Sequence, residues 1–181
     1  MKAKRISKEG IYKGKIIKLE RVRVRLPNKN ITTLDIIDHP GAAAVVPVTK
    51  DGRIILIRQY RYAGGGYLYE IPAGTLNKGE RPIDCARREI VEEIGYKARR
   101  FTRLKTILTT PGFTNEKIHI YLAEDLVPAR SKLDADEVIE VRIFKKDEVI
   151  KMIWDGKIKD AKSLIGLYSF LYDKRPGTKK N

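Results

Sequence analysis

Residues 74–96 read GTLNKGERPIDCARREIVEEIGY, and this stretch decides the fold because it places several glutamates on one helix. Pro82 is typical of the first turn of a helix, and Gly95 is typical of the position that ends one. A buried apolar stripe is indicated by four residues at helical spacing, Ile83, Ala86, Ile90 and Ile94. The stretch therefore predicts an amphipathic helix that begins near Pro82 and ends at Gly95.

The acidic residues of this helix form a cluster. Glu89 and Glu93 are four residues apart, so their side chains project side by side, and Glu92 lies at the edge of the same group. Like charges at this spacing repel, and divalent cations with a preference for oxygen ligands, Mg²⁺ or Mn²⁺, would stabilise them. The alternative is a solvated acidic helix with salt bridges to Arg87 and Arg88.

The order of residues in this stretch resembles the Nudix box. That signature is Gly, five residues, Glu, seven residues, Arg-Glu, an apolar residue, any residue, Glu-Glu, any residue, Gly and a bulky apolar position. Tyr96 fills the last position, where an aliphatic residue is more usual. The other fixed positions are filled by Gly74, Glu80, Arg88, Glu89, Ile90, Glu92, Glu93 and Gly95.

Flanking segments resemble one branch of this superfamily, the ADP-ribose pyrophosphatases. Residues 58–61 (RQYR) look like the branch's basic strand end, and residues 69–74 (YEIPAG) look like its lead-in to the box. Pro111 lies 16 residues after Gly95, close to the proline that marks the branch. Residues 111–116 resemble its substrate loop. Residues 136–141 and 156–162 match its C-terminal half.

The expected fold is a mixed α/β domain, because strands precede and follow the helix and two helices end the chain. The resemblance implies a Nudix-type α/β/α sandwich with a mixed sheet. A small N-terminal antiparallel β-hairpin is predicted from alternating residues 22–26 and 31–37. Residues 42–48 and 54–58 read as a further hairpin, joined at residues 50–53. We expect a β region at 1–39, a hydrolase domain at 40–172 and a basic, disordered tail at 173–181.

The resemblance implies a metal site. Its expected ligands are Glu89, Glu93, Glu92 and the backbone carbonyl of Ala73, and the expected ion is Mg²⁺, with Mn²⁺ as the alternative. The resemblance also suggests that Arg88 orients a glutamate. Glu80 lies outside the cluster of residues at helical spacing, so we expect it to have a supporting role.

Candidate substrate contacts lie outside the box. Arg58 and Arg61 are candidates to bind a diphosphate, because guanidinium pairs bidentately with phosphate oxygens; the alternative is a solvated strand end. Glu70 is a candidate for hydrogen bonds to adenine or ribose, and an ion pair with a nearby arginine is the alternative. Three further candidates lie in the loop, namely Gly112, Phe113 and Glu116, and loop packing is the alternative for Phe113.

The resemblance assigns the catalytic base to an acidic loop at residues 134–137. Glu137 aligns best with the family's loop glutamate, and Asp136 is the reserve candidate. Glu92, within the box, is the alternative base. An acidic surface loop without a catalytic role is the remaining interpretation. His39, His119 and Cys85 are interpreted as structural.

Composition limits the remaining function classes. The formal net charge of +15 invites a nucleic-acid interpretation, but the basic residues are scattered among acidic ones. High charge with a single glutamine is also typical of heat-adapted proteins. No apolar run reaches membrane-spanning length. Cys85 is the only cysteine, which excludes an intrachain disulfide and fits a reducing cytoplasm.

Three functions are therefore weighed. The leading one is Mg²⁺-dependent hydrolysis of ADP-ribose to AMP and ribose 5-phosphate. The second is hydrolysis of another nucleoside diphosphate derivative, such as a nucleotide sugar or a dinucleoside polyphosphate. The third is nucleic-acid binding on the same scaffold, which three crowded carboxylates argue against. The resemblance further implies a homodimer formed through the N-terminal strands. The composition predicts no membrane association and no specific nucleic-acid partner.

Overall fold

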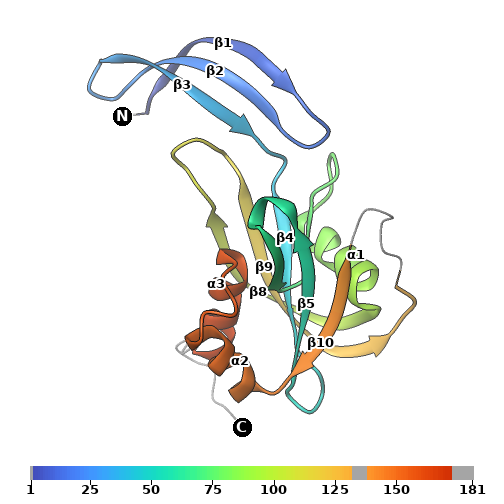
Figure 1. Cartoon of the computed structure of the whole chain (residues 1–181). Helices are drawn as coiled ribbons and strands as arrows, with labels where there is room; N and C mark the ends of the chain where they lie inside the picture. Colours follow the sequence, from blue (N-terminus) through green and yellow to red (C-terminus); the bar gives the residue numbers. More distant parts are fainter. Residues whose placement is uncertain (1, 132–137, 173–181) are drawn as a thin grey trace. The chain divides into compact units, whose positions relative to one another are not determined.

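The computed structural model describes residues 2–131 and 138–172 (Figure 1). The chain divides into two compact units, Met1–Gly41 with Ile107–Ile118, and Ala42–Thr106 with His119–Asn181. The predicted tail at 173–181 and the acidic loop at 134–137 lie outside the described residues. The predicted domain limits at 39/40 and 172/173 stay predictions.

The first unit contains an antiparallel sheet in the order β1-β2-β3, formed by β1 (Lys4–Lys13), β2 (Lys18–Arg25) and β3 (Ile31–Asp38). The predicted hairpin corresponds to β2 and β3, in which Val22 lies opposite Leu34 and Val24 lies opposite Thr32. The first strand was not predicted. Its apolar residues do not alternate regularly, and its pairing with β2 contains two register shifts, between Arg5 and Ser7 and between Gly10 and Tyr12.

The second unit is built on a four-stranded sheet in the order β7-β4-β9-β8. Its strands are β4 (Ala42–Pro47), β7 (Ala73–Thr75), β8 (Tyr96–Leu108) and β9 (Lys117–Pro128). Every residue of β4 is buried, as expected for a central strand covered on both faces.

A second sheet has the order β10-β5-β6, with β5 (Ile54–Arg61), β6 (Gly66–Glu70) and β10 (Ile139–Phe144). The predicted hairpin between residues 42–48 and 54–58 is therefore wrong in its pairing, because β4 and β5 belong to different sheets. Only Val48 and Ile54 form an isolated bridge beside the turn. The turn at 50–53 was identified correctly, but strand partners depend on distant residues that the turn does not encode.

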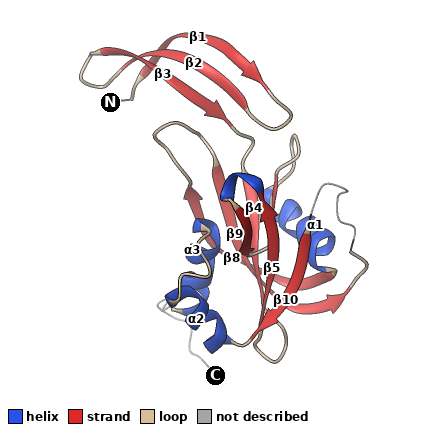
Figure 2. Cartoon of the chain, viewed as in Figure 1, coloured by secondary structure: helices blue, strands red, loops and turns tan. Residues whose placement is uncertain are grey.

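Helices cover both faces of the four-stranded sheet (Figure 2). Ala43 and Val45 of β4 pack in one core cluster with Ala86 and Ile90 of α1 (Pro82–Ile94). On the opposite face, Gly166 of α3 (Ala161–Leu171) approaches Val46, as well as Ile71 and Ile120. Alternation along β4 sends these side chains to opposite faces. This arrangement confirms the α/β/α layering and the mixed α/β class.

The two C-terminal helices are predicted from the sequence at about residues 147–154 and 161–172, and the observed helices lie within one residue of these limits. They are α2 (Lys146–Trp154) and α3, and a short 3₁₀ turn, η1 (Tyr62–Gly64), precedes β6. Asp160 caps α3 by accepting a hydrogen bond from the Ser163 backbone N–H at 2.9 Å. The part of the chain that the structure describes contains no helix long and apolar enough to cross a membrane.

Candidate active site

Helix α1 carries the acidic cluster and has the predicted limits. Pro82 occupies its first turn, and Gly95 ends it in the left-handed conformation at φ 71°. Cys85, Ala86 and Ile90 anchor its apolar face in the core. Glu89 and Glu93, which flank that stripe, are therefore buried themselves, with 7% and 2% of their surface exposed.

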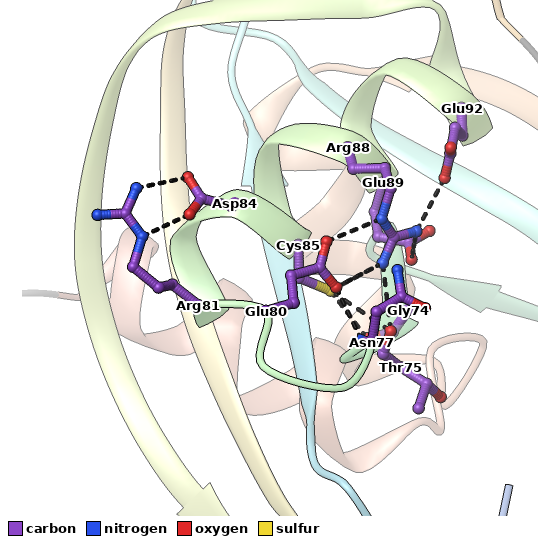
Figure 3. A network of polar contacts seen from close by, with 10 residues as sticks. All are labelled: Gly74, Thr75, Asn77, Glu80, Arg81, Asp84, Cys85, Arg88, Glu89 and Glu92. Atoms are coloured by element: carbon purple, nitrogen blue, oxygen red, sulfur yellow. Dashed lines mark hydrogen bonds and ion pairs between the residues drawn. The ribbon is translucent and has the colours of Figure 1, made fainter.

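Arg88 lies at the centre of the acidic cluster (Figure 3). Its Nε and Nη2 donate to the two carboxylate oxygens of Glu80, each at 3.0 Å. Its Nη1 donates to Glu89 at 2.6 Å and to Glu92 at 2.9 Å. Nη2 also donates to the Thr75 carbonyl at 3.2 Å. One guanidinium thus joins three glutamates to the loop that leads into the helix.

This network shifts the ionisation of its members. The hydrogen bond from Arg88 is the main cause that lowers the pKa of Glu80, and the Asn77 backbone N–H, which donates at 2.9 Å, adds to it. The same bond is the main cause that raises the pKa of Arg88 above its ordinary value. Both groups therefore stay charged at neutral pH, and Glu80 has the supporting position that the sequence suggested.

The turn at Ala73 and Gly74 lies against the other carboxylates. Glu93 accepts a hydrogen bond from the Ala73 backbone N–H at 3.0 Å. A Cβ placed on Gly74 would lie 1.7 Å from Oε1 of Glu89, so only glycine leaves room for that carboxylate. The backbone at 73–74 and the side chains of Glu89 and Glu93 therefore come together, as the proposed metal site requires.

The donor set suits Mg²⁺ or Mn²⁺, because it offers carboxylate oxygens and a backbone carbonyl. Within residues 2–131 and 138–172, no three acidic, histidine or cysteine side chains are arranged so that they could bind one metal ion. Arg88 engages Glu89 and Glu92 instead. Glu92 lies at the edge of the network, with 36% of its side chain exposed.

Glu70 is held in ion pairs. Arg61 donates to it through Nε and Nη2, both at 2.9 Å, and Lys162 Nζ lies 2.5 Å from Oε2. Burial by itself would raise the pKa of Glu70, but the hydrogen bond from Arg61 and the charge of Lys162 outweigh it and lower the pKa. The structure thus shows the ion pair that was the alternative to substrate contact.

Arg58 and Arg61 lie on different faces of their sheet. They are three residues apart in regularly paired β5, so their side chains alternate. Arg58 donates to Glu140 at 3.1 Å, and its guanidinium stacks 3.9 Å from the centre of the Tyr67 ring. Arg61 belongs with Glu70, and the charge of Glu93 also acts on it. The structure therefore does not bring the two arginines together.

The candidate substrate loop belongs to the first unit, where Thr114 forms an isolated bridge with Ile37 of β3. Ile37 donates a backbone hydrogen bond to the Phe113 carbonyl at 2.7 Å, and the Asn115 side chain donates to Asp38 at 2.7 Å. Glu116 accepts from the Thr109 hydroxyl at 2.8 Å and lies 3.6 Å from His39 Nδ1. The Phe113 side chain is half exposed. Glu137 and Asp136 lie outside the described residues.

The comparisons with known proteins agree with this geometry. Residues 38–165 match the family described as the NUDIX domain. The chain belongs to the NUDIX domain family. Among its relatives is an ADP-ribose pyrophosphatase of Bacillus subtilis (strain 168), 40% identical over 90% of this chain and 89% of that protein. A methanol dehydrogenase activator of Bacillus methanolicus is 37% identical over 91% of this chain and 90% of that protein.

A solved structure shares the NUDIX fold. The crystal structure of an ADP compounds hydrolase superposes with a TM-score of 0.82, covering 95% of this chain and 94% of that one at 22% identity. This likeness confirms the NUDIX fold inferred from the box.

Several residues near the candidate site of this NUDIX domain were not predicted from the sequence. Lys162 and Ser163 of α3 and its N-cap residue Asp160 are linked to Glu70 and Ile71. The only sequence signal for Asp160 and Lys162 was the match of residues 156–162 to the branch, and Ser163 lies outside that match. Gln59 is 5% exposed, and its Oε1 has no hydrogen-bond partner within the described structure. A buried orphan acceptor is costly, so a water or ligand donor is expected there.

Proposed function

We propose that this NUDIX hydrolase cleaves the diphosphate of ADP-ribose to give AMP and ribose 5-phosphate. The observation that carries the proposal is the turn at Ala73 and Gly74, which lies against the buried carboxylates of Glu89 and Glu93 beside the Arg88 network. The 40% identity to an ADP-ribose pyrophosphatase over most of both chains supports the choice of substrate.

The metal site is proposed to be formed by Glu89, Glu92, Glu93 and the carbonyl of Ala73. A bound Mg²⁺, or Mn²⁺ in its place, supplies charge neutralisation on the phosphate oxygens and lowers the pKa of a water. The protein contributes orientation: Arg88 and Glu80 hold the loop and the glutamates of α1 in one geometry.

The substrate contacts are proposed from charge and position. Arg61 binds the diphosphate, since its side chain is 40% exposed and the charge of Glu93, a proposed metal ligand, acts on it. Arg58 is a further candidate from the opposite face. Glu70, Gly112, Phe113 and Glu116 are also proposed as contacts to the rest of the substrate; for Glu70, such a contact would have to coexist with its ion pairs.

Glu137 is proposed as the base that deprotonates the attacking water, with Asp136 in reserve and Glu92 as the alternative. Loss of a base lowers kcat with little change in KM. We therefore expect Glu137→Gln to lower kcat and Glu92→Gln to weaken the Arg88 network. Full turnover by Glu137→Gln together with loss of turnover by Glu92→Gln would indicate that the base is Glu92 of α1 and not Glu137.

The function is tested with a substrate panel. Wild-type protein with Mg²⁺ is incubated with ADP-ribose, a nucleotide sugar and a dinucleoside polyphosphate, and products are separated by chromatography. The highest kcat/KM on ADP-ribose is expected, while preference for another compound would support the second function. RNA binding across a salt series is the parallel assay, and we expect weak binding that falls steeply with salt. Sub-micromolar binding at physiological salt would support the third function.

Assembly and location are proposed as well. The N-terminal sheet and the turn between β1 and β2 expose six large apolar side chains, which supports a homodimer through this unit: Ile6, Ile11, Tyr12, Ile16, Ile31 and Leu34. A cytoplasmic location is proposed from the single, buried cysteine. Heat adaptation is proposed from the high charge, and a midpoint of thermal unfolding typical of mesophilic domains would contradict it.

A further inference from the structure

A buried ionic network connects the N-terminus of α3 to the end of β5. Glu70 is 2% exposed and accepts from Arg61 on one side and from Lys162 on the other. Lys162 also lies 3.0 Å from Asp160, and its side chain is 12% exposed. The network therefore spans β5, β6 and α3, and each side chain in it is held in position by its ion-pair partners.

The same helix end holds the backbone that leads to Ala73, the residue whose carbonyl is a proposed metal ligand. The Ser163 hydroxyl accepts a hydrogen bond from the Ile71 backbone N–H at 2.8 Å and donates to Asp160 at 2.5 Å. Ile71 lies two residues before Ala73, whose N–H donates to Glu93. Thus α3 is linked through Glu70 to the arginine proposed to bind phosphate, and it holds the backbone two residues before Ala73, the residue proposed to supply a metal ligand.

The charges explain why a second cation is needed. The Glu70 carboxylate accepts hydrogen bonds from Nε and Nη2 of Arg61, so Nη1 is the nitrogen that Glu70 does not engage. If Arg61 alone faced the buried carboxylate, its charge would be largely cancelled. Lys162 binds the Glu70 carboxylate as well as Asp160, and the Asp160 carboxylate is also held by the backbone N–H and the hydroxyl of Ser163. Lys162 thus offsets part of the Glu70 charge, so Arg61 keeps positive potential for an anion while its side chain stays fixed.

We propose that Lys162 is a positioning residue for the diphosphate: it balances Glu70 so that Arg61 is held rigid and remains attractive to a phosphate. The proposal rests on the proposed function, in which Arg61 binds the diphosphate. Lys162 itself needs no contact with substrate. Its role is exerted through the carboxylate of Glu70, which both cations bind. Glu70 lies nine residues after Arg61 and 92 residues before Lys162 in the sequence.

The test compares Lys162→Met with Lys159→Met, which removes the same charge from an exposed position three residues earlier. KM for ADP-ribose and the Kd of ADP, measured calorimetrically in EDTA, are expected to rise about tenfold in Lys162→Met, the effect of losing one charge-assisted hydrogen bond. The kcat is expected to change less than twofold. Lys159→Met is expected to match wild type. Equal KM and Kd in the two variants would overturn the proposal.

A double-mutant cycle with Arg61→Gln separates positioning from a general structural effect. If Lys162 acts through Arg61, Lys162→Met adds no further loss of ADP affinity in the Arg61→Gln background. Additive losses would overturn the proposal. If Lys162→Met fails to fold, Lys162→Gln, which keeps a hydrogen-bond donor without the charge, takes its place in the cycle with the same expectations.

The outcomes also distinguish this proposal from the function on which it rests. A wild-type protein that cleaves none of the diphosphates contradicts the proposed function directly. Unchanged ADP affinity in Arg61→Gln contradicts the role of Arg61, and with it the positioning role of Lys162. Active wild type and weakened Arg61→Gln, with Lys162→Met unaffected, contradict the positioning role alone.

Discussion

At the scale of single residues, Arg88 shows why the acidic cluster needs an arginine. Its planar guanidinium presents several N–H groups in fixed directions, and these reach Glu80, Glu89, Glu92 and a backbone carbonyl at once. A lysine has one ammonium on a flexible stem and cannot occupy these positions together. The sequence suggested one glutamate partner for Arg88, whereas the structure shows three.

The first prediction concerns Glu93. Glu93→Gln keeps the side-chain volume and an oxygen that can accept the Ala73 N–H, but it removes the charge proposed to bind the metal. We expect kcat to fall by about 10²–10³, as for loss of electrostatic stabilisation in other enzymes, with the fold intact. Activity at saturating Mg²⁺ and the circular dichroism spectrum are measured together.

The matched control for Glu93→Gln is Asp84→Asn on the same helix. Asp84 forms its ion pairs with Arg81 and Arg87, and it is not proposed as a metal ligand. Its variant is expected to keep wild-type turnover. Near-normal turnover by Glu93→Gln would remove this glutamate from the metal site.

The second prediction concerns Cys85, which is fully buried. Burial first, and then the charge of Glu89, raise the pKa of its thiol to about 12. The thiol is therefore neutral at pH 8, and iodoacetamide is expected to modify it only after unfolding. Mass spectrometry of native and urea-unfolded protein measures the difference, and rapid labelling of native protein would contradict the packing role.

The same pKa shift has a consequence for stability. Below the ordinary thiol pKa of 9.0 the thiol is protonated in both folded and unfolded chains, so it does not make the free energy of unfolding depend on pH in that range. Above that pH the unfolded chain loses the proton while the folded chain keeps it. The contribution of Cys85 therefore makes the folded state less stable as pH rises from about 9 toward 12.

At the scale of elements, the turn before α1 and the helix itself depend on each other. A third prediction follows, that Gly74→Ala displaces the Glu89 carboxylate, because the new Cβ would lie within 2.6 Å of three carboxylate atoms. Metal affinity and activity are expected to fall about 10–100-fold, as for lost supporting contacts in metal sites. Mn²⁺ titration followed by paramagnetic resonance measures the affinity apart from turnover.

Gly10→Ala is the control for Gly74→Ala, since the added Cβ at Gly10 meets no atom within 4 Å. Its Mn²⁺ affinity is expected to equal that of wild type. If Gly74→Ala also binds Mn²⁺ normally, the close approach of Glu89 to the turn has no part in metal binding.

At the scale of the whole molecule, the N-terminal sheet gives the fourth prediction. Leu34 lies opposite Val22 on the apolar face of β2 and β3, and it is 38% exposed. We expect wild-type protein to be a dimer by light scattering and Leu34→Lys to shift it toward monomer. Thr33→Lys, on the opposite face beside Arg23, is the control and is expected to remain dimeric. A monomeric wild type at high micromolar concentration would exclude the homodimer.

The sequence predicted local features well. The limits of α1 came from apolar spacing and from Pro82 and Gly95, because helical hydrogen bonds join residues four apart. Strand pairing was harder to predict. The strands β4 and β5 are adjacent in sequence, yet they pair in different sheets: β4 lies between β7 and β9, and β5 lies between β6 and β10. Each strand thus has a partner, β9 or β10, that lies far along the chain.

By itself, then, the sequence determined the acidic helix, its glutamates and the membership of the NUDIX family, because these depend on spacing within one short stretch. Only the tertiary structure decided that Arg61 and Arg58 face different partners, and that Lys162 meets Glu70 across 92 residues. The physical reason is that an ion pair between elements depends on where packing places them. Spacing along the chain reports only which residues share a local face.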